Sequence, residues 1–290
     1  MTEAVQQGNS VIVSGVDDFD TDHVFDCGQC FRWNREDDGS YTGTASGRTV
    51  NISYSGGVLK IENCTVQDFD GFWYGYLDLA RDYGKIKKKI SEGDDVMKRA
   101  VDFGAGIRLL QQDPWETVIS FIISQNSNIP RIKKCIECLC ELFGDPLESF
   151  GGKKRYAFPR PEQLARLARE DLAPVRLGYR DQYIISTAAE VAEDGGALLT
   201  AAAKMPHDEA QKEIRKLKGV GPKVADCILL FGLHQYDSFP LDVWMKKIMS
   251  ELYGFAEDDV KGMDAYAREK FGELSGFAQQ YLYYYARFNL

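Results

Sequence analysis

The spacing of apolar residues changes along the chain and predicts two kinds of structure. Between residues 10 and 62, short apolar runs alternate with turns rich in Asp, Gly and Ser, which is typical of β-strands. The five expected strands are VIVSG, QCFRWN, YTGTAS, RTVNIS and GVLKIE. From residue 112 the period becomes helical, because apolar side chains recur on one helix face at Trp115, Val118, Ile119, Ile122 and Ile123. The pattern predicts an α+β fold, with an antiparallel β domain over residues 1–105 and an all-α domain over residues 106–290.

One glycine-rich stretch, FGGKKR, lies inside the helical part. No expected strand precedes it, and a phosphate-binding loop normally follows a strand. We therefore interpret this stretch as a loop between two helices.

Seven cysteines occur in the chain, an odd number with an uneven distribution. Cys27/Cys30 and Cys135/Cys138/Cys140 have spacings that metal ligands also use, but the second group shares a helical apolar stripe with its neighbours. Free cysteine is among the most buried residue types, so we interpret these residues as reduced, buried side chains. The N-terminus lacks a basic segment followed by an apolar one, which favours an intracellular protein of the cytoplasm or nucleoid, or of the nucleus in a eukaryote.

The charge is unevenly distributed. The chain carries 35 basic and 44 acidic residues, a formal net charge of -9, which excludes a protein that coats nucleic acid by bulk positive charge. Residues 1–80 hold 4 basic and 13 acidic side chains, so the rest of the chain is neutral overall. Basic residues are concentrated at 153–180 and 212–223, which leaves room for a compact basic surface. No stretch approaches the roughly 20 apolar residues that span a bilayer, so no membrane is expected as a partner.

A tight turn between two expected helices is the first feature that predicts a binding site. In EIRKLKGVGPKVADCILLFGL, Gly219 and Gly221 permit positive φ angles and Pro222 suits the start of a helix. The backbone amides of Gly219, Val220 and Gly221 would then form an anion site that can hold a DNA phosphate.

Two residues after this turn, a lysine and an aspartate, are candidates for catalysis. Lys223 begins the second helix, and Asp242 follows in FPLDVW, just before another expected helix that it would cap. The L-x-G-V-G-x-K-V-A-D-C run and the later P-x-D-V resemble the helix-hairpin-helix DNA glycosylase superfamily, and specifically its 8-oxoguanine DNA glycosylase/AP lyase family. Further matching segments are CGQCFRW, DPWETVISFIISQNSNIPRI, LGYRDQY and GFAQQYLYYYA. The resemblance covers nearly the whole chain in the family's order.

The resemblance implies a bifunctional enzyme of base excision repair. It would flip 8-oxoguanine out of duplex DNA, excise it through a Schiff base on Lys223 assisted by Asp242, and cleave the 3′ side of the abasic site by β-elimination. These residue types suit that chemistry, because a neutral amine can attack C1′ and a carboxylate can stabilise a cationic sugar. Two alternatives stay open: a glycosylase for another damaged base, and a non-catalytic helix-hairpin-helix DNA-binding module.

The resemblance also implies a base pocket. The carbonyl of Gly28 would accept the N7 hydrogen that distinguishes 8-oxoguanine from guanine, and Gln279 would meet the Watson–Crick edge. Tyr283 and Cys227 would lie on opposite faces of the base, with Phe231 beside them. A C-terminal helix over residues 276–288 would complete this pocket.

Further roles follow from the same resemblance. Asn126 would fill the gap left by the flipped base, while Arg131, Tyr179 and Arg180 would contact the orphaned base or wedge beside it. Trp244 stands where better-known members use a histidine on the nucleotide phosphate, and Phe231 and Tyr283 replace a methionine and a phenylalanine.

The implied cofactors and partners are few. No cysteine follows Cys227, so the iron–sulfur cluster of related glycosylases has no ligands here. No cofactor is expected for the reaction, although the hairpin of such enzymes can hold a structural monovalent ion or Ca²⁺ through the carbonyls of Arg215, Leu217 and Val220. The expected partner is double-stranded DNA containing 8-oxoguanine, bound by a monomer.

Overall fold

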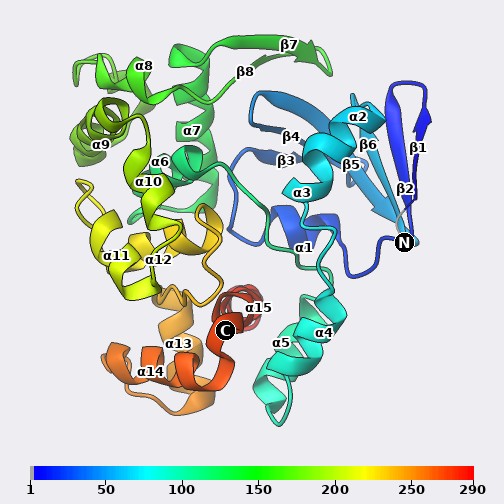
Figure 1. Ribbon diagram of the computed structural model, residues 1–290, viewed down its shortest axis with the longest axis vertical. Helices are drawn as coiled ribbons and strands as arrows, with labels where there is room; N and C mark the ends of the chain where they lie inside the picture. The colour runs from blue at the N-terminus through cyan, green and yellow to red at the C-terminus, as the bar shows by residue number, and fades with distance from the viewer. Residues whose placement is uncertain (1–2) are drawn as a thin grey trace. The chain divides into compact units, whose positions relative to one another are not determined.

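The computed structural model describes residues 3–290 and divides into two compact units (Figure 1). The first unit combines three stretches, Met1–Gln29, Ser53–Gln111 and His234–Leu290, and the second combines Cys30–Ile52 with Gln112–Leu233. The expected domain boundary between residues 105 and 106 is a single cut along the sequence, whereas each compact unit combines separate stretches of the chain. The boundary therefore stays a prediction. In residues 3–290, no helix is both long enough and apolar enough to cross a membrane.

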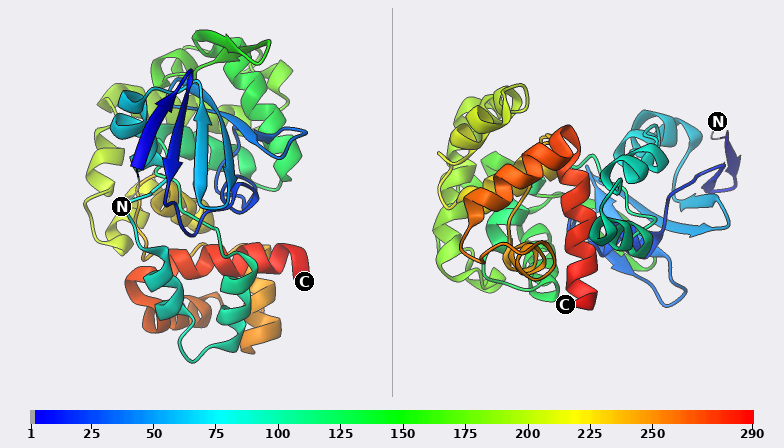
Figure 2. Two further views of the ribbon diagram at one scale, coloured as in Figure 1. Left: turned by 90° about the vertical axis from the view of Figure 1, so that its right-hand side faces the viewer. Right: turned by 90° about the horizontal axis from the view of Figure 1, so that it is seen from below.

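The first unit contains strands, short helices and the C-terminal helices. Its elements are β1 (Glu3–Gln7), β2 (Ser10–Ser14), α1 (Thr21–Phe25), β6 (Val58–Glu62), α2 (Val66–Asp68), the π-helical turn Phe69–Trp73, α3 (Tyr74–Tyr76), α4 (Tyr83–Ile90), α5 (Asp95–Phe103), α13 (Val243–Tyr253), α14 (Val260–Phe271) and α15 (Ser275–Asn289). Helix α15 packs on α5, α13 and α14 (Figure 2). It is buried along most of its length, and Tyr281 is fully buried.

The second unit is mainly helical. Its elements are β3 (Trp33–Arg35), β4 (Tyr41–Ala45), α6 (Pro114–Ser124), α7 (Ile129–Phe143), β7 (Pro146–Phe150), β8 (Lys153–Tyr156), α8 (Pro161–Ala165), α9 (Asp181–Asp194), α10 (Ala197–Ala202), α11 (His207–Ile214) and α12 (Pro222–Phe231). Helix α6 packs against α7, α9 and α12. Four of the five residues of its expected apolar stripe are buried, and Trp115 is half-buried.

The N-terminal sheet follows the order β1-β2-β6-β5-β4-β3, where β5 is Arg48–Ser55 and the division between the units falls after Ile52. The pairs β1/β2, β2/β6, β3/β4 and β4/β5 are antiparallel, with Val11 opposite Ile61 in the β2/β6 pair and Gly43 opposite Val50 in the β4/β5 pair. The predicted antiparallel β domain followed by a helical domain is therefore confirmed.

Two details of the strand prediction were wrong. The run QCFRWN contributes only its last residues to β3, because the chain turns at Gly28 with φ +82° and the side chain of Gln29 binds backbone groups. The strand β1 was missed, since EAVQQ alternates weakly between polar and apolar positions and gains its hydrogen bonds from β2.

The stretch FGGKKR is not a loop between helices. It forms the turn of the β7–β8 hairpin, in which Gly151 and Gly152 have φ angles of +59° and +72°. Two consecutive positive φ angles are what a tight hairpin turn requires. The expectation failed because strands as short as these lack a readable period.

The cysteines fit the interpretation as reduced side chains. All seven are free thiols, and all are buried except Cys138, which is half-buried. Burial raises the pKa of Cys27 to about 12, so this thiol remains protonated at neutral pH.

Candidate active site

The tight turn between α11 and α12 has the predicted geometry at Gly219. Its φ is +85°, and a Cβ atom there would lie 2.5 Å from ring carbons of Tyr183. Gly219 is therefore required both by its left-handed backbone and by the close approach of α9.

The second glycine behaves differently from the prediction. Gly221 has φ -86° and ψ 177°, so it is extended and does not use the left-handed region. It is the N-cap of α12, and Pro222 occupies the first turn as expected. The lack of a side chain at Gly221 leaves open space beside the amides at this helix end.

Two carbonyls of the hairpin are held by side chains of neighbouring helices. Thr187 donates its hydroxyl to the carbonyl of Lys218 at 3.2 Å, and Gln125 donates Nε2 to the carbonyl of Gly219 at 2.9 Å. These bonds fix the direction of the hairpin backbone, on which an anion site made of amides depends.

Lys223 lies on the first turn of α12, half-buried, and its Nζ is 5.6 Å from the ring centroid of Phe121. The Phe121 ring stacks on Phe231 at 5.5 Å with an interplanar angle of 11°. Cys227 is buried one turn after Lys223 on the same helix. The second unit thus brings Lys223, Cys227 and Phe231 together on α12.

The turn after α6 carries Asn126, which is exposed and has φ +46°. Arg180 is only 6% exposed, and its guanidinium donates to the carbonyls of Gln125 and Asn126 while lying 4.5 Å from the ring centroid of Tyr179. Arg131 and Tyr179 are exposed. In this structure Arg180 supports the Asn126 turn, whereas the other three side chains reach the surface.

In the first unit, Asp242 is the N-cap of α13, as predicted. Its Oδ1 accepts a hydrogen bond from the backbone N–H of Met245 at 2.8 Å. The segment before it is tied to α15, because the carbonyl of Tyr236 accepts from the N–H of Gly276 at 2.7 Å. Trp244 follows on the first turn of α13 and is half-buried.

Gly28 lies against the ring of Tyr283 on α15. A Cβ atom at Gly28 would stand 2.9 Å from Cε1 and 3.0 Å from the hydroxyl oxygen of Tyr283. Only glycine meets both this contact and the φ of +82°.

Gln279 is 4% exposed and bridges to the Asp242 segment. Its Nε2 donates to the carbonyl of Pro240 at 3.3 Å, while its buried Oε1 has no hydrogen-bond partner among residues 3–290. A buried acceptor without a partner is costly and points to a ligand that supplies the donor. The first unit therefore brings Gly28, Gln279 and Tyr283 together at α15.

Two buried residues beside this set were missed in the sequence. Gln29 and Gln280 are each 1% exposed and contact the backbone around Gly28. A signal existed for Gln280, because it interrupts the apolar stripe of Phe277, Tyr281 and Tyr284.

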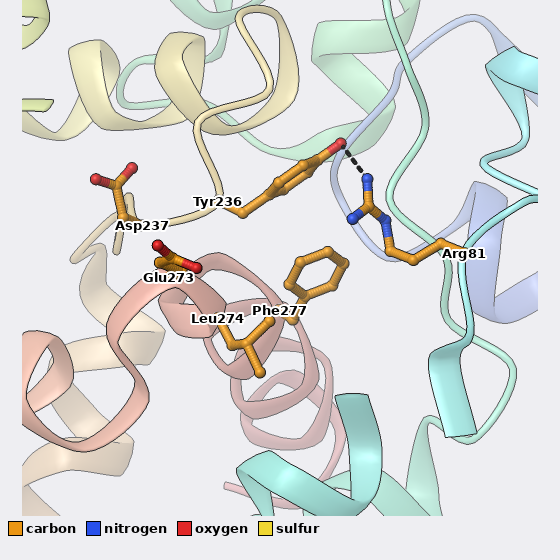
Figure 3. A pocket seen from close by; sticks show the side chains of 6 residues that line it. All are labelled: Arg81, Tyr236, Asp237, Glu273, Leu274 and Phe277. Carbon is orange, nitrogen blue, oxygen red and sulfur yellow. Dashed lines mark hydrogen bonds between the residues drawn. The ribbon is translucent and has the colours of Figure 1, made fainter. Parts of the chain in front are cut away.

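A separate pocket opens near the start of α15 (Figure 3). Its lining residues are Arg81, Tyr236, Asp237, Glu273, Leu274 and Phe277. Arg81 donates to the hydroxyl of Tyr236 at 3.2 Å and to Asp78 at 2.6 Å, so its charge is already paired. None of the predicted site residues lines this pocket.

Clusters suited to metal binding were not found. Within residues 3–290, no group of three or more His, Cys, Asp or Glu side chains is arranged to hold a metal ion.

Comparison with known proteins gives the family. A family model described as 8-oxoguanine DNA glycosylase, N-terminal domain, matches residues 11–118, and one described as HhH-GPD superfamily base excision DNA repair protein matches residues 119–273. The probable N-glycosylase/DNA lyase of Methanothermobacter thermautotrophicus is 33% identical over 214 residues, covering 67% of this chain and 68% of that protein.

Solved structures agree with this result. MBOgg1 in complex with a low affinity DNA ligand has a TM-score of 0.94 and 47% identity, covering 99% of this chain and 98% of that one. The 8-oxoguanine glycosylase/lyase of Clostridium acetobutylicum, bound to double-stranded DNA with cytosine opposite 8-oxoguanine, has a TM-score of 0.94 and 44% identity, covering 100% and 98%. The resemblance found in the sequence is confirmed, and the chain belongs to the 8-oxoguanine DNA glycosylase family of the HhH-GPD superfamily.

Proposed function

We propose that this chain is a bifunctional DNA glycosylase/AP lyase that excises 8-oxoguanine from duplex DNA and then cleaves the 3′ side of the abasic site. The observation that carries the proposal is the position of Lys223. This lysine begins the helix after a phosphate-binding hairpin, and its amine faces the aromatic ring of Phe121. A lysine on the first turn after such a hairpin lies where its amine can reach the sugar of a nucleotide held there, and an amine nucleophile forms a Schiff base with C1′.

Lys223 and Asp242 have separate roles in the proposed reaction. The lone pair of Nζ forms a bond to C1′ as the bond from C1′ to the base breaks, and the base leaves with the electron pair and takes up a proton. The sugar ring then opens to a Schiff base on Lys223. Water takes the C2′ proton, the C2′–H electrons form a double bond to C3′ and the 3′ phosphate leaves with the electrons of the C3′–O bond. Water then hydrolyses the Schiff base and frees Lys223. The carboxylate of Asp242 stabilises the positive charge that develops on the sugar.

In the first unit, Gly28, Gln279 and Tyr283 are proposed to bind the damaged base. The carbonyl of Gly28 accepts the N7 hydrogen of 8-oxoguanine, which guanine lacks. Oε1 of Gln279 accepts from the Watson–Crick edge, and this supports the role because that buried oxygen has no partner within residues 3–290. Tyr283 stacks on the base. In the second unit, Cys227 and Phe231 are proposed for contacts with the base.

The DNA around the flipped base is held by surface residues. We assign Asn126 to the gap left by the base, and Arg131 and Tyr179 to the orphaned base. Exposure of these three side chains supports the assignment. Arg180 holds the backbone of the Asn126 turn and contributes to the same wedge.

The hairpin is proposed as the phosphate clamp. The amides of Gly219 and Gly221 are proposed to bind a DNA phosphate at the N-terminus of α12, while the N–H of Val220 closes the turn by donating to the carbonyl of Leu217 at 3.1 Å. Trp244 is proposed to contact the phosphate of the flipped nucleotide. A monovalent ion or Ca²⁺ would use the carbonyls of Arg215, Leu217 and Val220. The side chains of Thr187 and Gln125 bind the intervening carbonyls of Lys218 and Gly219, which supports this choice.

Borohydride trapping tests the proposal. Duplex DNA with 8-oxoguanine opposite cytosine is incubated with the enzyme and borohydride, and a covalent adduct is expected. Lys223→Gln should form none, whereas Lys218→Gln, which removes an exposed lysine of the same hairpin, should trap normally.

The two alternatives predict different results. No adduct with the wild-type enzyme would favour the non-catalytic DNA-binding module. An adduct with Lys223→Gln would refute the assigned nucleophile, and an adduct only with a different damaged base would refute the substrate.

A further inference from the structure

Two successive carbonyls before Gly28 accept hydrogen bonds from α15. Arg287 donates Nη1 to the carbonyl of Asp26 at 2.6 Å, and Gln280 donates Nε2 to the carbonyl of Cys27 at 2.6 Å. The Gln280 side chain is 1% exposed, so its bond to Cys27 lies out of water. Helix α15 thereby fixes the backbone immediately before the carbonyl that meets the base.

The residue after Gly28 is held equally firmly. Gln29 donates Nε2 to the carbonyls of Val24 at 2.9 Å and Arg108 at 2.8 Å, and its Oε1 accepts from the N–H of Leu110 at 2.9 Å. Every polar atom of this buried side chain is engaged with backbone. A satisfied buried amide of this kind rigidifies the segment that carries it.

Arg108, whose carbonyl accepts from Gln29, is also held in place by hydrogen bonds. The buried guanidinium of Arg108 donates to the carbonyls of Asp17 at 2.7 Å, Asp18 at 3.0 Å and Asp78 at 2.7 Å. The carbonyl of Arg108 that Gln29 uses therefore belongs to a fixed part of the first unit.

The backbone of Gly28 depends on these hydrogen bonds of its neighbours more than the backbone of another residue type would. Gly28 has no side chain to restrict its dihedral angles, and its φ of +82° lies where glycine moves freely. The direction of its carbonyl depends on the peptide plane between Gly28 and Gln29, which is soft unless both flanks are held.

We infer that Gln280 and Gln29 are positioning residues that aim the Gly28 carbonyl, and that they thereby set the enzyme's preference for a base carrying hydrogen on N7. The inference rests on the proposed function, in which Gly28 makes that contact. A preorganised acceptor discriminates strongly because its orientation does not have to be gained during binding.

Gln280 is the residue to change, because Gln29 has more bonds and its variants could misfold. Gln280→Met keeps the size of the side chain and removes the donor to Cys27. Gln280→Glu keeps the shape and places an oxygen against the Cys27 carbonyl. The matched control is Gln163→Met on α8, which removes a half-buried glutamine whose Nε2 binds Asp145 at 3.0 Å.

Affinity is measured in a Lys223→Gln background, so that no chemistry intervenes. Three duplexes are compared, with 8-oxoguanine, guanine or a tetrahydrofuran abasic-site analogue opposite cytosine. Gln280→Met should lower the ratio of 8-oxoguanine to guanine affinity by about three- to tenfold, the range for one neutral hydrogen bond, and Gln280→Glu by more. Affinity for the abasic analogue should stay unchanged in both, and Gln163→Met should change none of the three.

The outcomes separate the inference from the proposed function. If the background protein does not prefer 8-oxoguanine to guanine, the role of Gly28 is wrong and the inference falls with it. If the preference exists but Gln280→Met and Gln280→Glu leave the ratio intact, the inference alone is wrong. Equal weakening on all three duplexes would show a general structural role and would also overturn the inference.

Discussion

Gly28 and Tyr283 approach so closely that a Cβ atom on Gly28 would lie 2.9 Å from Cε1 of the tyrosine ring. The ring proposed to stack on the damaged base therefore touches the residue proposed to recognise it. Any side chain at position 28 would displace either the ring or the carbonyl.

The first prediction concerns that contact. Gly28→Ala combines a left-handed backbone with a steric clash, so excision of 8-oxoguanine should fall at least tenfold, measured under single-turnover conditions. Gly57→Ala is the control, because Gly57 has φ +80° but its nearest neighbour would be 3.9 Å away. It should lose stability, on the order of 1–2 kcal/mol, and keep its excision rate. An active Gly28→Ala enzyme would argue against the pocket.

The second prediction separates the two roles of Asp242. Asp242→Asn keeps an N-cap for α13 but loses the charge, so excision should fall by about 10²–10³-fold with little change in melting temperature. Asp242→Ala should lose activity and also about 1 kcal/mol of stability. Asp259→Asn changes an equivalent cap, which accepts from Gly262 at 2.9 Å, and should affect neither quantity. Normal excision by Asp242→Asn would refute the electrostatic role.

The third prediction tests the hairpin. Gly219→Ala would place a Cβ atom 2.5 Å from the ring of Tyr183 at a φ of +85°, so the hairpin must distort. Affinity for undamaged duplex DNA should fall together with affinity for damaged duplex, both by about tenfold or more in fluorescence anisotropy titrations, because phosphate contacts carry no sequence information. Gly195→Ala is the control, since φ is +61° there and nothing lies within 4 Å. Loss confined to damaged DNA would contradict a phosphate clamp.

The fourth prediction concerns stability and pH. Burial raises the pKa of Glu116 to about 7. The positive charge of Arg32 lowers this pKa, whereas the negative charges of Asp113 and Glu137 raise it further. The folded protein then holds a proton that the unfolded chain has released, so stability should decrease as pH rises from about 4.5 to 7. Glu116→Gln should therefore raise the melting temperature at pH 8, by roughly 2–4 °C for each 1 kcal/mol, with little effect at pH 4. Glu148→Gln, an exposed control on β7, should change neither value. Equal effects of Glu116→Gln at both pH values would exclude the titration of this carboxyl group.

Much of the site could be predicted because its signals are local. Pro222 at a helix start and the cap at Asp242 each depend on residues within a few positions of one another. Such features form wherever the local chain adopts the helix, so spacing and residue type suffice. The left-handed turn at Gly219 belongs to the same class.

Other features escaped the sequence for separate reasons. Gly221 precedes Pro222 and is the N-cap of α12, which favours an extended backbone over the expected positive φ. The β7–β8 hairpin comes from a strand pairing too short to show a period. The bond from Arg180 to the Asn126 carbonyl joins residues 54 positions apart and helps to leave Arg180 only 6% exposed.

The sequence by itself determined the change from a β domain to a helical domain, the resemblance to the family, and the residue types that can perform the chemistry. Only the tertiary structure decided how the Gly28 carbonyl is held, because the bond from Gln280 to Cys27 joins residues separated by 253 positions. A hydrogen bond over that distance exists only when α15 packs against the loop, so its effect on the site depends on the fold and not on any local pattern.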